Sequence, residues 1–414
     1  MSNAEKLWWG GPIMRRFFFL LSAALSFNLA VHAGNEQPVQ CCGRECCSTD
    51  DGLNQTVTGY LRIKNVCVPG QTTCPLTVPG FCRPVNVYKV VQDHPAPLVI
   101  VLLGISGTAT SDLSKLWPRW YAQAGYHVLT FNSTFNPEFL EIANRGVSGN
   151  IWSETECVRD IVNAFLATVP DRSKVTKIGV VGMSYGGVEA LILGRMQSDG
   201  KLPFKLDAVQ AYSPPIDMRQ TAGILDDWYN QYRWNYTLAE LYFKVAGYSP
   251  GQSEPLSGCI LRAVIAASFQ HELAPVIIAN DKKFCLQNLD HSLDRDHLRE
   301  AAGQWGFTRF AFSMALPWWR QHMKDQDIDS ELEQTRLTNL LQHQPPCTLA
   351  VLAADDPFNT PEDLHELQQA APRLPVYIAP RGGHLGYVSA AWTKAKLLSL
   401  FECGKEPVAE SEKK

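Results

Sequence analysis

A short glycine-rich turn at residues 182–187 constrains the fold of this chain more than any other stretch. Its sequence, Gly-Met-Ser-Tyr-Gly-Gly, directly follows an apolar, β-branched run at 177–181 and overlaps the start of a helical pattern at 185–197. A serine in this strand–turn–helix setting is typical of a nucleophile elbow, in which small neighbours allow a sharp turn that exposes the hydroxyl. The alternative is a tight turn with an incidental serine. We expect Ser184 to be a catalytic nucleophile.

Short apolar strands alternate with helical stretches around this turn, and a capping box at 153–156 indicates one helix start. The expected strands lie at 98–103, 126–131, 177–181 and 206–211, and the expected helices at 111–124, 153–168 and 185–197. Such alternation predicts a mostly parallel, doubly wound sheet with helices on both faces. A helical, aromatic stretch at 214–345 interrupts the pattern before strands resume at 347–352 and 374–378, followed by a helix at 389–402. The predicted fold class is therefore α/β, with a helical cap inserted before the last two strands.

Partners for the serine follow the last two expected strands. A serine hydroxyl is a poor nucleophile until a base takes its proton, and in this kind of sheet an acid and then a histidine follow the serine in sequence. His384 lies in a glycine-rich loop after the final strand, and we expect it to be the base; a purely structural histidine is the alternative. Asp355 and Asp356 follow the preceding strand, and only one can face the imidazole. Asp356 is favoured because a proline follows it directly, which would leave Asp355 as a turn or cap residue.

Two backbone N–H groups are needed to hold the oxyanion of an acyl-transfer intermediate. The first should come from Tyr185, directly after the nucleophile. The second should come from Ile105, in the loop 104–107 that follows the strand at 98–103. The alternative for this loop is a plain glycine-rich turn between a strand and a helix.

With these residues assembled, the chain resembles the α/β-hydrolase superfamily, and most closely its YheT-type bacterial hydrolases and their ABHD relatives in eukaryotes. The resemblance covers about residues 98–400 and rests on four stretches: Gly-Met-Ser-Tyr-Gly-Gly at 182–187, Ser-Pro-Pro-Ile-Asp at 213–217, Asp-Asp-Pro-Phe at 355–358 and Gly-Gly-His-Leu-Gly at 382–386. It implies an α/β-hydrolase fold and hydrolysis of carboxylic esters, lipid esters among them, under a helical cap. Two positions depart from the family pattern. Leu103 stands in place of a histidine before the oxyanion loop, and Asn-Ser-Thr at 132–134 replaces an Arg-Gly pair.

The expected chemistry is acyl transfer in two steps through an acyl-enzyme, without a metal or an organic cofactor. Aromatic residues in the stretch 214–345 favour an apolar acyl group or a lipid as substrate, although a cap core packing on itself explains them equally well. Peripheral contact with a membrane fits the same reading. Two other functions stay open: a serine peptidase acting on small peptides, and a non-catalytic binding protein on a hydrolase scaffold.

The N-terminus resembles a cleaved export signal. Two arginines at 15–16 precede an uncharged, mostly apolar run at 17–31, and small residues stand at the −3 and −1 positions before Gly34. We therefore expect a secreted or periplasmic protein. The alternative is an uncleaved segment that anchors the chain in a membrane.

Cysteine usage is consistent with export. Clustered cysteines in an exported chain predict a disulfide framework, and the alternative, a zinc site, is disfavoured because no histidine lies among them. Seven of the twelve cysteines form this cluster: Cys41, Cys42, Cys46, Cys47, Cys67, Cys74 and Cys82.

The charge balance excludes one class of partner. A net charge of −4 over 414 residues provides no basic surface for nucleic acid. The predicted segments are a signal peptide at 1–33, a Cys-rich, disulfide-stapled extension at 34–84, the α/β core at 85–213, a helical cap at 214–345, the rest of the core at 346–403 and a disordered tail at 404–414.

Overall fold

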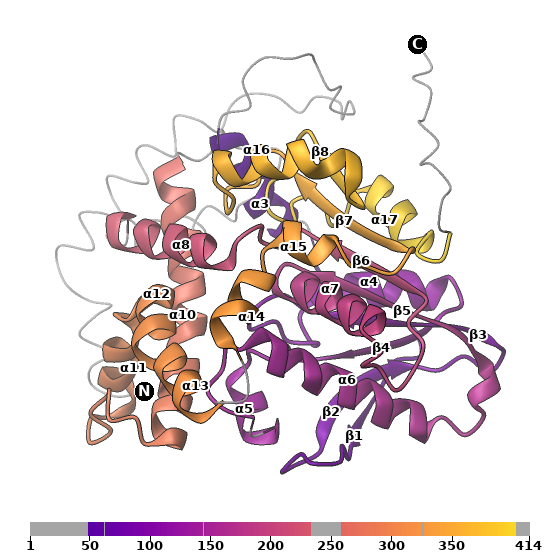
Figure 1. The fold of residues 1–414 in the computed structure, drawn as a ribbon, viewed down its shortest axis with the longest axis horizontal. Helices are drawn as coiled ribbons and strands as arrows, with labels where there is room; N and C mark the ends of the chain where they lie inside the picture. Colours follow the sequence, from indigo (N-terminus) through magenta and orange to yellow (C-terminus); the bar gives the residue numbers. More distant parts are fainter. Residues whose placement is uncertain (1–48, 62, 144, 233–257, 324–326, 403–414) are drawn as a thin grey trace, which may run out of the picture. The chain divides into compact units, whose positions relative to one another are not determined.

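The protein is described from a computed structural model that covers residues 49–61, 63–143, 145–232, 258–323 and 327–402 (Figure 1). The expected signal peptide, the first four cysteines of the cluster and the expected charged tail lie outside these residues. Export therefore stays a prediction from the sequence.

Eight strands form one mixed sheet in the order β1-β2-β4-β3-β5-β6-β7-β8. The six strands from β3 to β8 run parallel, whereas β2 is antiparallel to both of its neighbours. The mostly parallel sheet predicted from the alternation is confirmed, and with its helices it fits an α/β-hydrolase fold. The strands are β1 (Thr72–Leu76), β2 (Val85–Val90), β3 (Ala96–Leu102), β4 (His127–Phe131), β5 (Val175–Met183), β6 (Ala208–Tyr212), β7 (Thr348–Ala353) and β8 (Val376–Ala379).

Helices cover both faces of the sheet, which explains why β4 and β6 are buried along their whole length. On one face, apolar residues of α6 and α7 join the larger core cluster; on the other, Trp117 and Tyr121 of α4 join Leu397 of α17 in a second cluster (Figure 1). The helices outside the insertion are α3 (Thr49–Leu61), α4 (Asp112–Gln123), α5 (Pro137–Ala143), α6 (Ile151–Thr168), α7 (Tyr185–Ser198), α16 (Pro361–Ala370) and α17 (Ala391–Leu398), with short 3-10 turns at Arg172–Lys174 and Ala371–Arg373.

A run of helices lies between β6 and β7, at the position predicted for the insertion. Its longest helix, α10, includes a stretch, Leu261–Phe284, that is long and apolar enough to cross a membrane by length and composition alone; 56% of its apolar window is buried inside the protein, as in a core helix. The run comprises α8 (Met218–Tyr232), α10 (Gly258–Phe284), α11 (Arg295–Gly303), α12 (Gly306–Arg309), the π-helix η3 (Phe310–Ala315), α13 (Leu316–His322), α14 (Ile328–Gln334) and α15 (Leu337–Leu341).

The described part of the N-terminal stretch, from residue 49 onward, contributes helix α3 and the edge strand β1. Val85 and Val87 of β2 are buried on either side of exposed Asn86, which is the period-two pattern of a strand with one covered face. Helix α6 also begins earlier than its capping box predicts, since the side chain of Asn150 accepts the N–H of Ser153 at 3.1 Å.

The cysteines described differ from the predicted framework. Cys67, Cys74 and Cys82 carry free thiols. Cys74 lies in β1, which is held in place by backbone pairing with β2 rather than by cross-links among these three residues. Cys347, outside the cluster, is disulfide-bonded.

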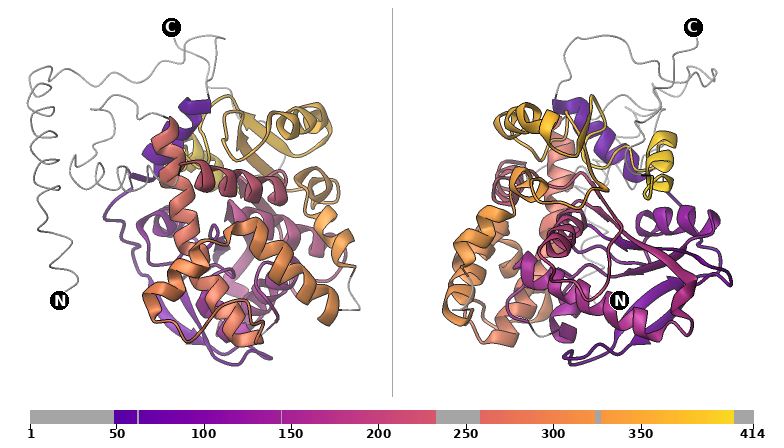
Figure 2. Two further views of the ribbon diagram at one scale, coloured as in Figure 1. Left: turned by 90° about the vertical axis from the view of Figure 1, so that its left-hand side faces the viewer. Right: turned by 45° about the vertical axis from the view of Figure 1, so that its right-hand side comes forward.

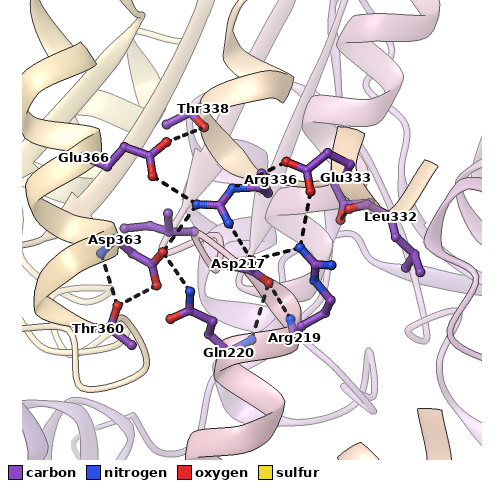
Figure 3. A network of polar contacts seen from close by, with 12 residues as sticks. Asp217, Arg219, Gln220, Leu332, Glu333, Arg336, Thr338, Thr360, Asp363 and Glu366 are labelled. Atoms are coloured by element: carbon purple, nitrogen blue, oxygen red, sulfur yellow. Dashed lines mark hydrogen bonds and ion pairs between the residues drawn. The ribbon is translucent and has the colours of Figure 1, made fainter. Parts of the chain in front are cut away.

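A polar network joins the two ends of the helical run (Figure 3). The guanidinium of Arg336, just before α15, lies 2.9 Å from the carboxylate of Asp217, just before α8, and 3.0 Å from Glu366 of α16. The N–H of Leu337 also donates to the carbonyl of Ile216 at 3.0 Å. The entry and the exit of the insertion are therefore held together and against the core.

Replacing Arg336 with alanine should lower the free energy of unfolding by about 2–4 kcal/mol, because it removes a partner of the buried Asp217 carboxylate. The matched control is Arg320→Ala, which breaks an ion pair with Asp329 between two exposed side chains and should cost about 0.5 kcal/mol or less. Urea unfolding measures both. Equal losses of unfolding free energy in the two variants would show that the Arg336 network does not stabilise the junction between the helical run and the core.

Candidate active site

The turn between β5 and α7 holds Ser184 in a conformation that serine rarely adopts. Its φ is 51° and its ψ −117°, and its N–H donates to the carbonyl of Tyr212 at 2.8 Å. A Cβ added at Gly182 would lie 1.9 Å from the carbonyl oxygen of Gly186, and one at Gly186 would lie 2.4 Å from that of Leu103. Any larger residue at either position would collide with a backbone carbonyl. This explains why the turn has glycines two residues before and two residues after the serine.

The structure brings Ser184, His384 and Asp356 together in one hydrogen-bonded chain. His384 Nε2 lies 2.9 Å from Ser184 Oγ, and its Nδ1 lies 2.9 Å from Asp356 Oδ2. The imidazole is buried, and the ring of Phe358 packs on it with centroids 4.5 Å apart. This order of contacts leaves Nε2 free to accept the serine proton when Nδ1–H donates to the carboxylate.

The two neighbouring aspartates make different contacts. Asp356 faces the imidazole, whereas Asp355 Oδ1 accepts the N–H of Gly383 at 2.8 Å and its Oδ2 accepts from Gln55 Nε2 at 3.2 Å. Burial raises the pKa of Asp355 above its usual value, and the N–H of Gly383 lowers it in part. Asp355 thus holds the loop that carries the histidine rather than the histidine itself.

The two predicted oxyanion donors both line the cavity into which Ser184 opens. Within the described part of the chain, the N–H of Ile105 donates no backbone hydrogen bond, and the N–H of Tyr185 stands in the first turn of α7, where helix N–H groups lack intrahelical partners. A Cβ added at Gly104 would lie 3.6 Å from Ser184 Cβ, so the loop approaches the serine closely. Leu103, which departs from the family pattern, is buried in the core.

A cavity of about 160 Å³ opens at Ser184. Its wall combines the serine turn with side chains from α8, α10, α12, η3 and α13, and among the described residues it includes no aspartate or glutamate. Among the described residues of the wall, the basic side chain is that of Arg219, which contacts Asp217 and Glu333. The aromatic members of the wall are Phe135, Tyr185, Phe269, Phe307, Phe310, Phe312, Trp319 and Phe358.

Two buried carboxyl groups that were not predicted from the sequence contact Thr134, and one of them also contacts Tyr185. Thr134 Oγ1 lies 2.6 Å from Glu189 and 3.2 Å from Glu154, and the hydroxyl of Tyr185 donates to Glu154 at 2.5 Å. Within the part of the chain that the structure describes, neither glutamate forms an ion pair with a lysine or an arginine. Burial raises the pKa of Glu154 and raises that of Glu189 to about 8. The available signal was Glu189 itself, a charged residue inside the apolar run of α7.

Within the described residues, no group of three or more His, Cys, Asp or Glu side chains could hold a metal ion.

The sequence matches no family model and no curated protein. Among solved structures, the chain is similar to a Pyrococcus furiosus esterase (11% identity over 88% of this chain and 98% of that one, TM-score 0.43) and to a Pyrobaculum calidifontis esterase (14% over 86% and 92%, TM-score 0.45). It is also similar to a bacterial membrane phospholipase A (13% over 94% and 97%, TM-score 0.44). Likeness this distant carries no argument about chemistry, which therefore rests on the geometry of the site.

The Glu189 carboxyl should make stability depend on pH. Its pKa in the folded protein, about 8, lies above the ordinary 4.5, so the folded state holds the proton more tightly and stability falls as pH rises between these values. The slope from one such group approaches about 1.4 kcal/mol per pH unit. Glu189→Gln should show a smaller fall between pH 5 and 8 in urea unfolding. The control is Glu300→Gln at an exposed position, and an unchanged fall in Glu189→Gln would contradict the assignment.

Proposed function

We propose that this protein is a serine hydrolase that cleaves carboxylic esters with an apolar acyl group. The observation that carries the proposal is the chain of hydrogen bonds from Asp356 through His384 to Ser184, which ends in an apolar cavity. The three residues are far apart in the sequence, and the fold brings them into contact at 2.9 Å spacings. A base that is hydrogen-bonded to a serine and oriented by a carboxylate is the arrangement that activates the serine hydroxyl.

In the proposed mechanism, His384 takes the proton of Ser184 as Oγ attacks the acyl carbonyl. The N–H groups of Tyr185 and Ile105 hold the resulting oxyanion, and His384 then gives its proton to the departing alkoxide. Water, deprotonated by His384, attacks the acyl-enzyme and releases the acid, which restores Ser184. Asp356 keeps the imidazole in the required tautomer and stabilises its cation.

We propose that the helices between β6 and β7 act as a cap that binds the acyl group. They contribute most of the apolar wall, including Met218 and Leu225 of α8 and Phe310 and Phe312 of η3. An apolar acyl chain, including that of a lipid ester, would release water from this surface on binding.

The wall also favours an ester over a small peptide with a free amine. A peptidase of that kind needs an acidic side chain to pair with the ammonium group, and the described wall of the cavity has none. A binding protein without catalysis is disfavoured, since all three members of the hydrogen-bonded chain are present and in contact.

A fluorophosphonate probe should label the wild-type protein at Ser184 and fail to label Ser184→Ala, because the probe reports an activated hydroxyl. Ser292→Ala, which removes an exposed serine hydroxyl, should label like the wild type. With p-nitrophenyl esters, kcat/KM should rise with acyl chain length and exceed that for aminoacyl anilides. An unlabelled wild type, or equal labelling of Ser184→Ala, would refute the proposal.

The two aspartates should respond differently to amidation. Asp356→Asn should lower kcat by about 10³- to 10⁴-fold, because the amide favours the wrong imidazole tautomer. Asp355→Asn keeps an acceptor for the N–H of Gly383 and should lower kcat by less than about tenfold. Steady-state ester hydrolysis measures both, and the reverse order of effects would show that Asp355 is the acid.

A further inference from the structure

The N-terminal helix α3 presents a face of small residues to the two loops that carry Asp356 and His384. Gly52, Thr56 and Gly59 lie at helical spacing and are buried, although α3 precedes the sheet in sequence. A Cβ added at Gly52 would lie 1.9 Å from the carbonyl oxygen of Asp355, and one at Gly59 would lie 2.5 Å from Gly386 Cα. The helix backbone therefore touches both loops, and these glycines are what let it approach.

Side chains from three separate elements bind the backbone of the loop at 382–386, which carries His384. The N–H of Gly383 donates to Asp355 Oδ1 at 2.8 Å, that of His384 to Thr56 Oγ1 at 2.8 Å, and that of Leu385 to Ser213 Oγ at 3.2 Å. The acceptors come from the end of β7, from α3 and from the end of β6. Thr56 is the one that holds the residue bearing the imidazole.

The hydroxyl of Thr56 both donates and accepts a hydrogen bond. It accepts the N–H of His384 and donates its own proton to the carbonyl of Gly52 at 2.7 Å, and the side chain is buried. Gly383 and Leu385, on either side of the histidine, both adopt positive φ, which a leucine keeps only where its surroundings fix it. The bonds from Asp355, Thr56 and Ser213 supply that fixation, and the bond from Thr56 acts on His384 itself.

A neighbouring face of α3 packs on the helical run. Leu53 and Val57 form an apolar cluster with Phe358, which contacts the imidazole, and with Leu261 and Ile265 of α10. Figure 2 shows α3, in indigo, beside α10. One short helix thus contacts the histidine loop, the acid loop and the helices that line the cavity.

We propose that α3 is part of the catalytic apparatus and that Thr56 is a positioning residue, which sets the reach of His384 Nε2 to Ser184 through the histidine backbone. This inference rests on the proposed serine hydrolase function. Thr56 touches no reacting atom. Its loss displaces the imidazole relative to the serine, and displacements of about 1 Å in such groups lower rates by about 10²-fold.

Thr56→Val keeps the shape of the side chain and removes the acceptor, so kcat for ester hydrolysis should fall by about 10- to 100-fold while KM changes by less than about twofold. Thr56→Ser restores the hydroxyl and should recover most of kcat. The downfield proton resonance of the Asp356–His384 hydrogen bond should shift or broaden in Thr56→Val and return in Thr56→Ser. Thr73→Val, which removes the hydroxyl of an exposed threonine in β1, should match the wild type in every measurement.

The two proposals fail in different ways. A wild-type protein that neither hydrolyses esters nor reacts with fluorophosphonate sinks the serine hydrolase function, while the resonance in Thr56→Val still tests whether α3 positions His384. An unchanged resonance and an unchanged kcat in folded Thr56→Val overturn the role of Thr56. If Thr56→Val does not fold, Thr56→Ala removes the same hydroxyl without the branched chain and is compared with Thr56→Ser in its place.

Discussion

The backbone of Ser184 lies at positive φ, and the rest of the site depends on the structure that keeps it there. A non-glycine residue in this region costs of order 1–3 kcal/mol and persists only where its surroundings fix it. Here the carbonyl of Tyr212 binds the serine N–H, and two glycines allow the chain to cross itself closely. The buried parallel strands on both sides supply the stability that offsets this local strain.

The sheet, the turn and the order of the site residues could be predicted because a short stretch of sequence indicates each of them. Ser184, Asp356 and His384 each follow a short apolar strand, and the carboxyl ends of neighbouring parallel strands meet at one edge of a sheet. The choice between Asp355 and Asp356 rested on a following proline, a weak local cue that happens to agree with the observed contacts. Strand β2, between β1 and β4, also carried a local signal in its alternating valines, although it is not among the predicted strands.

Other parts of the site had no local signal to read. Thr56 and His384 are 328 residues apart, and nothing in the sequence around either one indicates the other. Glu189 stands out in the sequence as a charged residue inside an apolar helix, but its contacts and those of Glu154 exist only once α6 and α7 pack together. The predicted disulfide framework does not extend to Cys67, Cys74 and Cys82, which carry free thiols, because clustering in the sequence does not fix which thiols meet in the fold.

The distance along the chain between α3 and the histidine loop also bears on the order in which the site assembles. During synthesis the N-terminal part emerges first, and α3 then has neither the loop at 382–386 nor α10 to cover its apolar side chains. Closing a loop of more than 300 residues is slow compared with forming local helices. The contact that holds His384 can form only after the last strand and its loop have been made, so a nascent chain that already includes the serine turn still lacks its base.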